Sequence, residues 1–582
     1  MEINPFNHSH FIGYINQITP QYVKIHFPSS VLMKSFTFYG EELKGGLVGS
    51  YVVIEGEKFG FLGKILELSL PEKERLELSE KSFNTKEFHP TGKIEILLSF
   101  ELFNPSKIDR GLNSLPMIGA KVFICSSEFI KGYFKEFGVK EENKDNAPVI
   151  DFGRLTYDKS TIVELSQQAL FGRHCAIVGT TGGGKSYTVS KLLESLIKNN
   201  GKAIVIDATG EYSPFDTNSK VSNTILSDTA YFPYSKLTIG DLFVLFRPSG
   251  QVQQPILLEA IKSLKIANCI QRDKDNFVHA VDGNKTIFKI GKKSPKDLII
   301  ENECIVKQGN ETSPFHNTHF IYKEEIEDDT SCYFNIQRLS QQIINECYQV
   351  SSGRWSSMQD GRNFGNSTSL IMRINSTVND TAFKKMFGFV VNKEEDVTEV
   401  IEKFLGDDNK NILRIGFEKV PFNFQAREIL ANAIGKYLLN KSRVEVFKQK
   451  PLILFIDEAH QFLNKKVKDE YFEVTELNSF DSIAKECRKY GLFLCIATQM
   501  PRDIPNGTLS QIGTFIAHRL INHQDKEAIA NACSSANRDT LAFLPVLGAG
   551  EAILMGVDFP MPVMLKVEMP KIRPNSDTPL FA

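Results

Sequence analysis

The chain has 582 residues, of which 42% are hydrophobic and 24% are charged, and its formal net charge is −2. This composition is typical of a soluble globular protein, and the length predicts two or three domains. No run of 18 apolar residues occurs, which excludes a membrane-spanning helix. The near-neutral charge excludes a protein that coats nucleic acid with its whole surface, so any nucleic-acid site has to be a local basic surface.

The N-terminus and the cysteines indicate the compartment. The first residues, MEINPFNHSHF, contain neither a basic segment nor an apolar core, so no secretory signal is expected. Nine cysteines are scattered singly without a C-x-x-C pair, which argues against a zinc site and against a redox dithiol. Several lie in apolar runs such as VFIC and LFLCIA, where a free cysteine is a small core residue. We expect a cytoplasmic protein with reduced thiols.

The first 150 residues contain short β-type runs separated by glycines. These runs lie at 22–27, 51–55, 61–68, 93–100 and 121–125. Short strands at fairly even spacing, with turn residues between them, predict a small barrel or a sandwich. The polar stretch 140–148 is a predicted linker, so an N-terminal β domain is expected over 1–150.

After residue 150, buried strands alternate with helices, which predicts a parallel sheet covered on both faces. A strand, a glycine loop and an amphipathic helix follow one another between Ala176 and Ile197. Further strands are expected at 203–212, 452–460, 492–499, 514–520 and 551–556. The fold class is therefore α/β, with the main domain over 151–566.

The segment between Tyr212 and Pro451 has mainly helical periodicity, as in FNFQAREILANAIGKYL at 422–438. We expect a mainly helical insertion at about 215–445. Its middle part, about 270–330, is polar and irregular and gives no assignment.

The stretch GTTGGGKS fits G-x-x-x-x-G-K-[ST], the pattern of a phosphate-binding loop. Its glycines allow backbone N–H groups to approach phosphates, and the following helix N-terminus adds positive potential. Lys185 is expected to reach the β- and γ-phosphates of ATP, and Ser186 to bind Mg²⁺. The alternative is a chance glycine turn, which the preceding strand and the following amphipathic helix argue against. The predicted nucleotide-binding residues are Gly179, Thr180, Thr181, Gly182, Gly183, Gly184, Lys185 and Ser186.

A second part of the site is predicted where the strand LILFI ends in Asp457 and Glu458. We expect Asp457 to hold Mg²⁺ through water and Glu458 to act as the general base on the attacking water. The alternative is a buried strand that ends in two solvated acids.

Two further positions fit ATP hydrolysis coupled to motion. Gln499 ends the strand LFLCIATQ, where its amide could sense the γ-phosphate; the alternative is a hydrogen bond to a loop backbone. Arg488 precedes that strand, where it could stabilise transition-state charge in a neighbouring subunit. A lone arginine is equally explained as a surface residue.

Together these segments resemble the HerA/FtsK division of RecA-like ATPases, and HerA most closely. The segments that carry the resemblance are RHCAIVGTTGGGKS, VIDATGEY, LFIDEAHQFL, AKECRKYGLFLCIATQMP, HRL and LPVLGAGEAILMG. They cover about 150–215 and 410–570. A phosphate loop alone is generic, whereas GEY after the second strand and RKYG before ATQ are much more specific. The N-terminal β region resembles the family's small barrel by position and strand pattern.

The resemblance implies a RecA-like P-loop ATPase core and roles for individual residues. By matching position, the Walker residues are Lys185, Ser186, Asp457 and Glu458. Gln499 resembles the sensor, and Arg488 resembles the arginine that acts between subunits.

The same resemblance gives weaker indications elsewhere. Arg173 stands just ahead of the phosphate-loop strand, where the family often has a basic residue facing the nucleotide. Asp207 and Glu211 belong to the second-strand motif, with nucleotide-binding roles that are less defined. The tail, 567–582, resembles the extended segment that family members lay over a neighbouring subunit.

The chain also departs from the family pattern. Gly183 stands where serine is usual, which should be harmless because the loop backbone binds the phosphates. Met500 stands where arginine is common, and no role is assigned to it. The segment 220–410 matches the family only loosely.

The resemblance implies a homo-hexameric ring that moves double-stranded DNA through a central channel. Basic loops that line the channel would reconcile DNA binding with the near-neutral charge; the alternative is solvated charge runs. The candidates are Lys285, Lys289, Lys292, Lys293 and Lys296, and the cluster NKKVK at 464–468.

Family members usually work beside a nuclease or another effector, because the motor itself rarely cuts DNA. Some are repair motors paired with nucleases, and some are motors of bacterial anti-phage systems paired with sirtuin-like NAD-hydrolysing proteins. The near-neutral charge and the long insertion favour a partnered defence motor. Two other classes stay open: a conjugation or secretion ATPase, and a nucleotide-gated scaffold that assembles and activates a partner enzyme.

Overall fold

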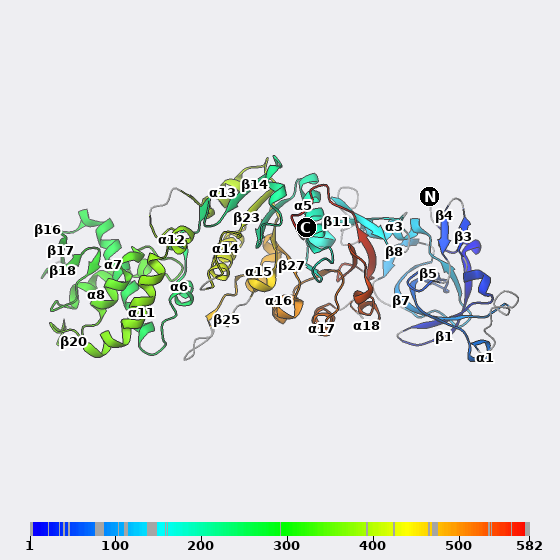
Figure 1. Cartoon of the computed structure of the whole chain (residues 1–582), viewed down its shortest axis with the longest axis horizontal. Helices are drawn as coiled ribbons and strands as arrows, with labels where there is room; N and C mark the ends of the chain where they lie inside the picture. Colours follow the sequence, from blue (N-terminus) through cyan, green and yellow to red (C-terminus); the bar gives the residue numbers. More distant parts are fainter. Residues whose placement is uncertain are drawn as a thin grey trace, which may run out of the picture. The chain divides into compact units, whose positions relative to one another are not determined.

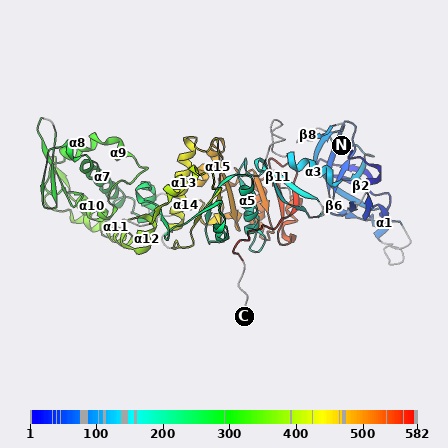
Figure 2. The same cartoon turned by 90° about the horizontal axis from the view of Figure 1, so that it is seen from above.

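The computed structural model describes residues 4–20, 22–33, 35–38, 41–44, 47–75, 87–102, 104–109, 114–136, 148–156, 159, 161–291, 293–390, 394–422, 425–463, 466–467, 475–533, 536, 538–559 and 561–576. The chain folds into two compact units. The first consists of Met1–Ala203, Pro451–His460 and Gly491–Ala582, and the second of Ile204–Lys450 and Gln461–Tyr490. Figures 1 and 2 show the elements of both units, coloured along the sequence.

The N-terminal strands of the first unit form a closed antiparallel barrel. The strand order is β2-β1-β9-β5-β6-β7, and β7 pairs back with β2; β8 extends β7. The bounds are β1 Phe11–Ile18, β2 Val23–His26, β5 Tyr51–Ile54, β6 Phe59–Ser69, β7 Thr91–Glu101, β8 Asn104–Asp109 and β9 Lys121–Ile124. The predicted barrel is confirmed.

The barrel interior is apolar, and a glycine allows the strands to curve. Alternate residues of the strands, such as Ile12, Val52 and Ile94, form one buried cluster. At Gly63 the register of β6 against β7 shifts, and a Cβ there would lie 2.6 Å from Cγ2 of Ile94. Because only glycine fits, the register shift bends β6 without a steric clash.

The second part of the first unit contains strands in the order β11-β10-β30-β29-β28-β12-β27-β24. Their bounds are β10 Val149–Leu155, β11 Ile162–Ser166, β12 Cys175–Val178, β24 Leu452–Ile456, β27 Leu492–Thr498, β28 Thr514–Ala517, β29 Glu551–Gly556 and β30 Val563–Val567. The strands β24, β27, β12 and β28 pair in parallel. The register places Val178 beside Thr498 and Ala517, so the carboxyl ends of these strands meet at one edge.

The helix α5 (Lys185–Lys198) follows β12 directly and begins at the end of the glycine loop. Its buried residues include Val189, Leu192, Leu193 and Leu196, which recur at the helical spacing. The predicted strand–loop–helix unit is confirmed, and it fixes the loop at the carboxyl edge.

The second unit contains a smaller group of strands in the order β13-β23-β14. β13 (Lys202–Asp207) starts at the boundary of the two units, and β14 (Val221–Ile225) pairs in parallel with β23 (Ile412–Gly416). Both β14 and β23 lie inside the range assigned to the helical insertion. They escape a pattern-based prediction because β14 is largely polar and β23 has a buried arginine, Arg414, at its centre.

Helices make up most of the rest of the second unit (Figures 1 and 2). They include α6 Ile239–Phe246, α7 Gln253–Arg272, α8 Ser313–Ile321, α10 Leu339–Glu346, α11 Gly361–Asn379, α12 Thr381–Phe387, α13 Val397–Gly406, α14 Ala426–Arg443 and α15 Ser479–Glu486. The mainly helical character of the insertion agrees with the sequence pattern.

The stretch that gave no assignment contains a four-stranded antiparallel sheet, β16-β17-β18-β19. The bounds are β16 His279–Asp282, β17 Lys285–Ile290, β18 Lys296–Glu301 and β19 Cys304–Ile305. Lys285 and Lys289 of β17 share one face with Asp297 and Glu301 of β18, which makes the sequence look polar, while Phe288 and Leu298 lie on the opposite face. The apolar face is buried.

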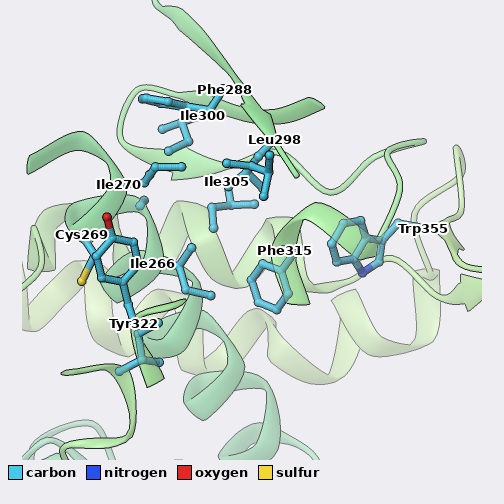
Figure 3. Close-up of a cluster of buried hydrophobic side chains, with 13 residues drawn as sticks. Ile266, Cys269, Ile270, Phe288, Leu298, Ile300, Ile305, Phe315, Tyr322 and Trp355 are labelled. Atoms are coloured by element: carbon cyan, nitrogen blue, oxygen red, sulfur yellow. The ribbon is translucent and has the colours of Figure 1, made fainter. Parts of the chain in front are cut away.

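Figure 3 shows how this face packs. Phe288 and Leu298 of the sheet meet Ile266 of α7, with Phe315 of α8 and Trp355 beside them. The chain's one tryptophan is thus part of the core of the insertion.

All nine cysteines are free and buried, as expected for small core residues. Among the described residues, no helix combines the length and the hydrophobicity that crossing a membrane requires.

Candidate active site

Four segments meet at the carboxyl edge of the parallel strands of the first unit. The glycine loop follows β12, Asp457 and Glu458 follow β24, Gln499 follows β27, and His518 follows β28. In open α/β sheets, ligands bind at this edge. Most of the predicted site residues are therefore brought together by the fold.

The glycine loop has a conformation that other residues would resist. Gly182 and Gly184 have positive φ values of 73° and 114°. A Cβ at Gly179 would lie 2.6 Å from Cβ of His518, and one at Gly184 would lie 3.0 Å from Cα of Gly550. These glycines therefore allow the loop to turn and to lie directly on the neighbouring strands.

Backbone hydrogen bonds hold the loop in this shape. The Thr180 N–H donates to the carbonyl of Arg519 at 2.9 Å, and the Gly183 N–H donates to the carbonyl of Thr180 at 3.0 Å. The Gly550 N–H donates to the carbonyl of Gly183 at 3.2 Å. These bonds connect the loop to the residue after His518 and to the turn before β29.

The first turn of α5 has the features of a phosphate and magnesium site. No side chain caps the helix N-terminus at Gly184, so the N–H groups of the first turn are not used by a cap. Lys185, mostly buried, is the first residue of the helix, and the Ser186 hydroxyl follows it. Asp457 follows β24 at the same sheet edge. Hydroxyl and carboxylate oxygens are the ligands that Mg²⁺ prefers. The residues present fit Mg-ATP.

Glu458 is buried and has a strained backbone, with φ of 46°. Its Oε1 accepts a hydrogen bond from Nε2 of Gln499 at 2.5 Å. Its Oε2 accepts no hydrogen bond from any described residue. Nδ1 of His460 lies 3.3 Å from Oε2, within ion-pair distance but without hydrogen-bond geometry. One carboxylate oxygen is therefore held by Gln499, and the other accepts no hydrogen bond from the described residues.

Gln499 connects this acid to the phosphate loop. Its Oε1 accepts a hydrogen bond from the Thr181 hydroxyl at 2.6 Å, while its Nε2 donates to Glu458. The partners of the amide are side chains, in contrast to the alternative of a bond to a loop backbone. A change at Thr181 in the loop can thus be passed through one side chain to Glu458.

His518 is a site residue that the sequence reading left without a role, although HRL was noted as a family segment. Its Nδ1 lies 2.8 Å from the carbonyl oxygen of Glu551, and its Nε2 lies 2.8 Å from the hydroxyl of Thr188 on α5. Because a carbonyl only accepts, Nδ1 carries the proton and Thr188 donates to Nε2. Burial lowers the pKa of His518 to about 4; the bond to Glu551 opposes this shift, and the Lys185 charge adds to it. The imidazole is therefore neutral at pH 7.

Arg173 is not brought to the phosphate loop. It precedes β12, whereas the loop follows it, and a strand of four residues spans roughly 13 Å. Its Nε donates to both carboxylate oxygens of Asp558, at 3.0 and 3.2 Å. The structure therefore does not bring Arg173 together with the phosphate loop that follows β12, and a role facing the nucleotide stays a prediction.

Asp207 and Glu211 belong to the second unit, and Asp207 is fully occupied. Its Oδ1 accepts from the N–H groups of Gly210 and Glu211 at 2.8 and 3.1 Å. Its Oδ2 accepts from the Tyr212 N–H at 3.0 Å and from Nε of Arg414 at 2.9 Å. Asp207 thus holds the GEY turn in place rather than offering an oxygen to a ligand.

Arg414 is the partner that sequence reasoning missed. It is 1% exposed, and its Nη2 donates to Oε1 of Glu418 at 2.8 Å. An arginine inside an apolar strand was the available signal, because a buried charge requires acidic partners.

Arg488 lies in the second unit, in the short helix Cys487–Tyr490. It is exposed, and it forms no ion pair with another residue in the described ranges. This exposure is consistent with both alternatives, a surface residue and an arginine presented to a neighbouring subunit.

Three of the candidate channel lysines have acidic partners. Lys285 and Lys289 lie opposite Glu301 and Asp297 on β18, with ion-pair distances of 3.6 and 2.5 Å. Lys296 pairs with Glu311 at 2.5 Å. These pairs offset the charge of the three lysines, which favours the alternative of a solvated charge run, and contact of this stretch with DNA stays a prediction.

The remaining candidates give less information. Lys293 is exposed, and Lys292 lies outside the described residues. Within NKKVK, residues 464, 465 and 468 also lie outside the described residues, and only the backbone of 466–467 is described.

The start of the C-terminal tail runs over its own unit. The Glu568 N–H donates to the carbonyl of Phe152 at 3.0 Å, and the Ile572 N–H donates to Oε1 of Glu194 on α5 at 2.5 Å. Residues 577–582 lie outside the described part, so contact of the tail with a neighbouring subunit stays a prediction.

Comparisons with known proteins agree with this geometry. A model of the central domain of helicase HerA matches residues 150–421, and a HerA-like C-terminal model matches residues 445–576. A probable helicase of Methanocaldococcus jannaschii is 26% identical, over 72% of this chain and 70% of that protein. The probable DNA double-strand break repair helicase HerA of the same organism is 24% identical, over 72% of this chain and 76% of that protein.

Among solved structures, a truncated form of the bacterial conjugative coupling protein TrwB is similar with a TM-score of 0.43 and 13% identity. The match covers 78% of this chain and 94% of that one.

The phosphate loop, the two acids after β24 and the glutamine after β27 define a P-loop ATPase. Within that class, the chain belongs to the HerA helicase family.

Proposed function

We propose that the chain hydrolyses ATP with Mg²⁺ in order to move double-stranded DNA through a homo-hexameric ring. The observation that carries the proposal is the chain of side chains Thr181–Gln499–Glu458, which connects the phosphate loop to the general base. Membership of the HerA family, whose relatives include a probable DNA double-strand break repair helicase, supports the choice of DNA as the substrate of the motor.

Each residue has a distinct task in this proposal. Lys185 and the N–H groups at the start of α5 hold the β- and γ-phosphates. Ser186 and Asp457 hold Mg²⁺, which offsets phosphate charge when it is bound.

Glu458 takes a proton from the attacking water at Oε2, while Gln499 keeps the carboxylate oriented through Oε1. Since Thr181 contacts Gln499, the state of the loop sets the orientation of the base.

Arg488 is proposed to act on the nucleotide of a neighbouring subunit, which requires a ring. We further propose that the motor works beside an effector, a nuclease or a sirtuin-like NAD-hydrolysing protein, in defence against phage. The described residues contain no group of three or more His, Cys, Asp or Glu side chains suited to a metal ion. The proposal assigns cleavage chemistry to the partner.

The test is ATP hydrolysis by the purified chain, with and without linear double-stranded DNA, beside Glu458→Ala as the blank. We expect DNA to stimulate hydrolysis in the wild type and to have no effect on the variant. Hydrolysis that is indifferent to DNA would contradict the translocase and favour a nucleotide-gated scaffold. Mixing Arg488→Ala with Glu458→Ala subunits tests the ring, because each variant supplies what the other lacks.

A further inference from the structure

The side chain of His518 lies directly beneath the phosphate loop. If Gly183 carried a Cβ, it would lie 3.4 Å from Cβ of His518, and one at Gly184 would lie 3.3 Å from Cε1 of the ring. The backbone of the next residue, Arg519, accepts a hydrogen bond from Thr180. The phosphate loop therefore packs directly against the two residues that follow β28.

Both ring nitrogens of His518 are used, and they reach in two directions. Thr188, one helical turn into α5, donates to Nε2, and Nδ1–H donates to the carbonyl of Glu551 at the start of β29. His518 and Thr188 are both 0% exposed, so the bond between them lies in the interior. The ring therefore fixes the distance between α5 and the β28–β29 pair.

The turn before β29 touches the same loop a second time. Gly550 donates to the carbonyl of Gly183, and its carbonyl accepts from the Val567 N–H at 2.9 Å. A shift of His518 would therefore move the loop in two ways, through the side chain that packs against it and through Gly550, which donates to Gly183. Lys185 and Ser186 start the helix that Thr188 anchors, so their positions depend on the same contact.

We propose that His518 is a positioning residue for ATP binding, which holds the phosphate loop and the first turn of α5 through Thr188. It touches neither ATP nor the reacting atoms. Its hydrogen bonds to Thr188 and to the carbonyl of Glu551 set the distance of Lys185 and Ser186 from the sheet. This inference rests on the ATP binding that the proposed function requires.

The experiment uses the full chain, four single variants and one double variant. Thr188→Val removes the donor with little change in shape. His518→Gln keeps an acceptor at the position of Nε2, and His518→Asn keeps a donor at the position of Nδ1. Thr514→Val is the matched control, because Thr514 lies on β28 and is as buried as Thr188, while its hydroxyl donates to the carbonyl of Ala169, on the helix Gln167–Phe171, at 2.9 Å.

We expect Thr188→Val and His518→Asn to raise the KM for ATP by about tenfold, with a smaller change in kcat. His518→Gln should recover most of the affinity. The double variant Thr188→Val/His518→Asn should show the same KM as either single variant, because both remove one shared contact. Thr514→Val should lower the melting temperature and leave the KM unchanged.

The proposal is overturned if Thr188→Val loses stability but keeps the wild-type KM, or if His518→Asn binds ATP better than His518→Gln. Independent, multiplying effects of the two substitutions would contradict it as well. ATP affinity, measured by titration in the Glu458→Gln background, separates this result from hydrolysis. If the wild type binds ATP but does not hydrolyse it, the proposed function fails while the positioning role is still tested.

Discussion

Two acids in this chain follow buried strands of similar sequence, and they do different work. Asp207 follows IVI in the second unit, and Glu458 follows LFID in the first unit. Asp207 accepts four hydrogen bonds, whereas Glu458 accepts one through Oε1, from Gln499. A saturated carboxylate stabilises a turn, and a carboxylate with a spare oxygen can take a proton. The difference lies in the neighbours, not in the acid.

The largest effects are expected when each of the two acids is replaced, in a separate variant, by the amide of the same shape. Glu458→Gln should reduce ATP turnover by ~10²–10⁴-fold because the general base is lost. Asp207→Asn should instead lower the free energy of unfolding by about 1–3 kcal/mol, since the buried Arg414 loses one of its three acidic partners and keeps only Glu418 and Asp216. Turnover and urea unfolding of both variants give the measurement.

We expect each variant to change mainly one of the two measurements, turnover for Glu458→Gln and urea unfolding for Asp207→Asn. Glu458→Gln should unfold at nearly the wild-type urea concentration, because it leaves no buried charge without a partner. A stable Asp207→Asn variant with lost turnover would place Asp207 in the active site and break the distinction between the two acids.

A smaller effect is expected from the pH dependence of stability. The pKa of His518 falls from 6.5 in the unfolded chain to about 4 in the fold, so the unfolded chain binds a proton first as the pH drops. Stability should be complete above pH 6.5 and should decrease towards pH 4, by about 3 kcal/mol in total from this residue. His518→Asn, measured by unfolding at pH 7 and pH 5, should show a flatter pH dependence. An unchanged slope would mean that other groups carry the loss.

The smallest effect is expected at the paired lysines of the insertion. The double variant Lys285→Ala/Lys289→Ala breaks two exposed cross-strand pairs, each worth about 0–1 kcal/mol. It should leave the affinity for double-stranded DNA and its salt dependence unchanged. A flatter salt dependence would return this sheet to the DNA surface. Lys465→Ala/Lys466→Ala is the contrast, because NKKVK keeps its predicted DNA contact.

Local sequence was sufficient for the elements whose chemistry is local. The phosphate loop, the helix after it and the acids after β24 could be placed from spacing alone, because glycine geometry and apolar periodicity act over a few residues. The N-terminal barrel also followed from short strands and glycines. The family followed from motifs that lie in the same strands.

Strands that carry charged residues on one face were not predicted from the sequence. The sheet β16–β19 was missed because Lys285, Lys289, Asp297 and Glu301 occupy its outer face. Half of such a strand is polar, and the apolar half is recognised as a core face only when α7 and α8 cover it.

By itself, the sequence determined that this chain is a P-loop ATPase of the HerA type, and it predicted which residues face the phosphates. Only the tertiary structure decided which polar side chains have all their hydrogen-bonding atoms used by neighbours and which keep an unused atom. Asp207 accepts a hydrogen bond from Arg414, which lies 207 positions away in the chain, and His518 is bonded to Thr188 across 330 positions. Arg173 was separated from the phosphate loop by the length of β12. The physical reason is that a hydrogen-bond partner is set by proximity in space, and burial makes each such partner obligatory.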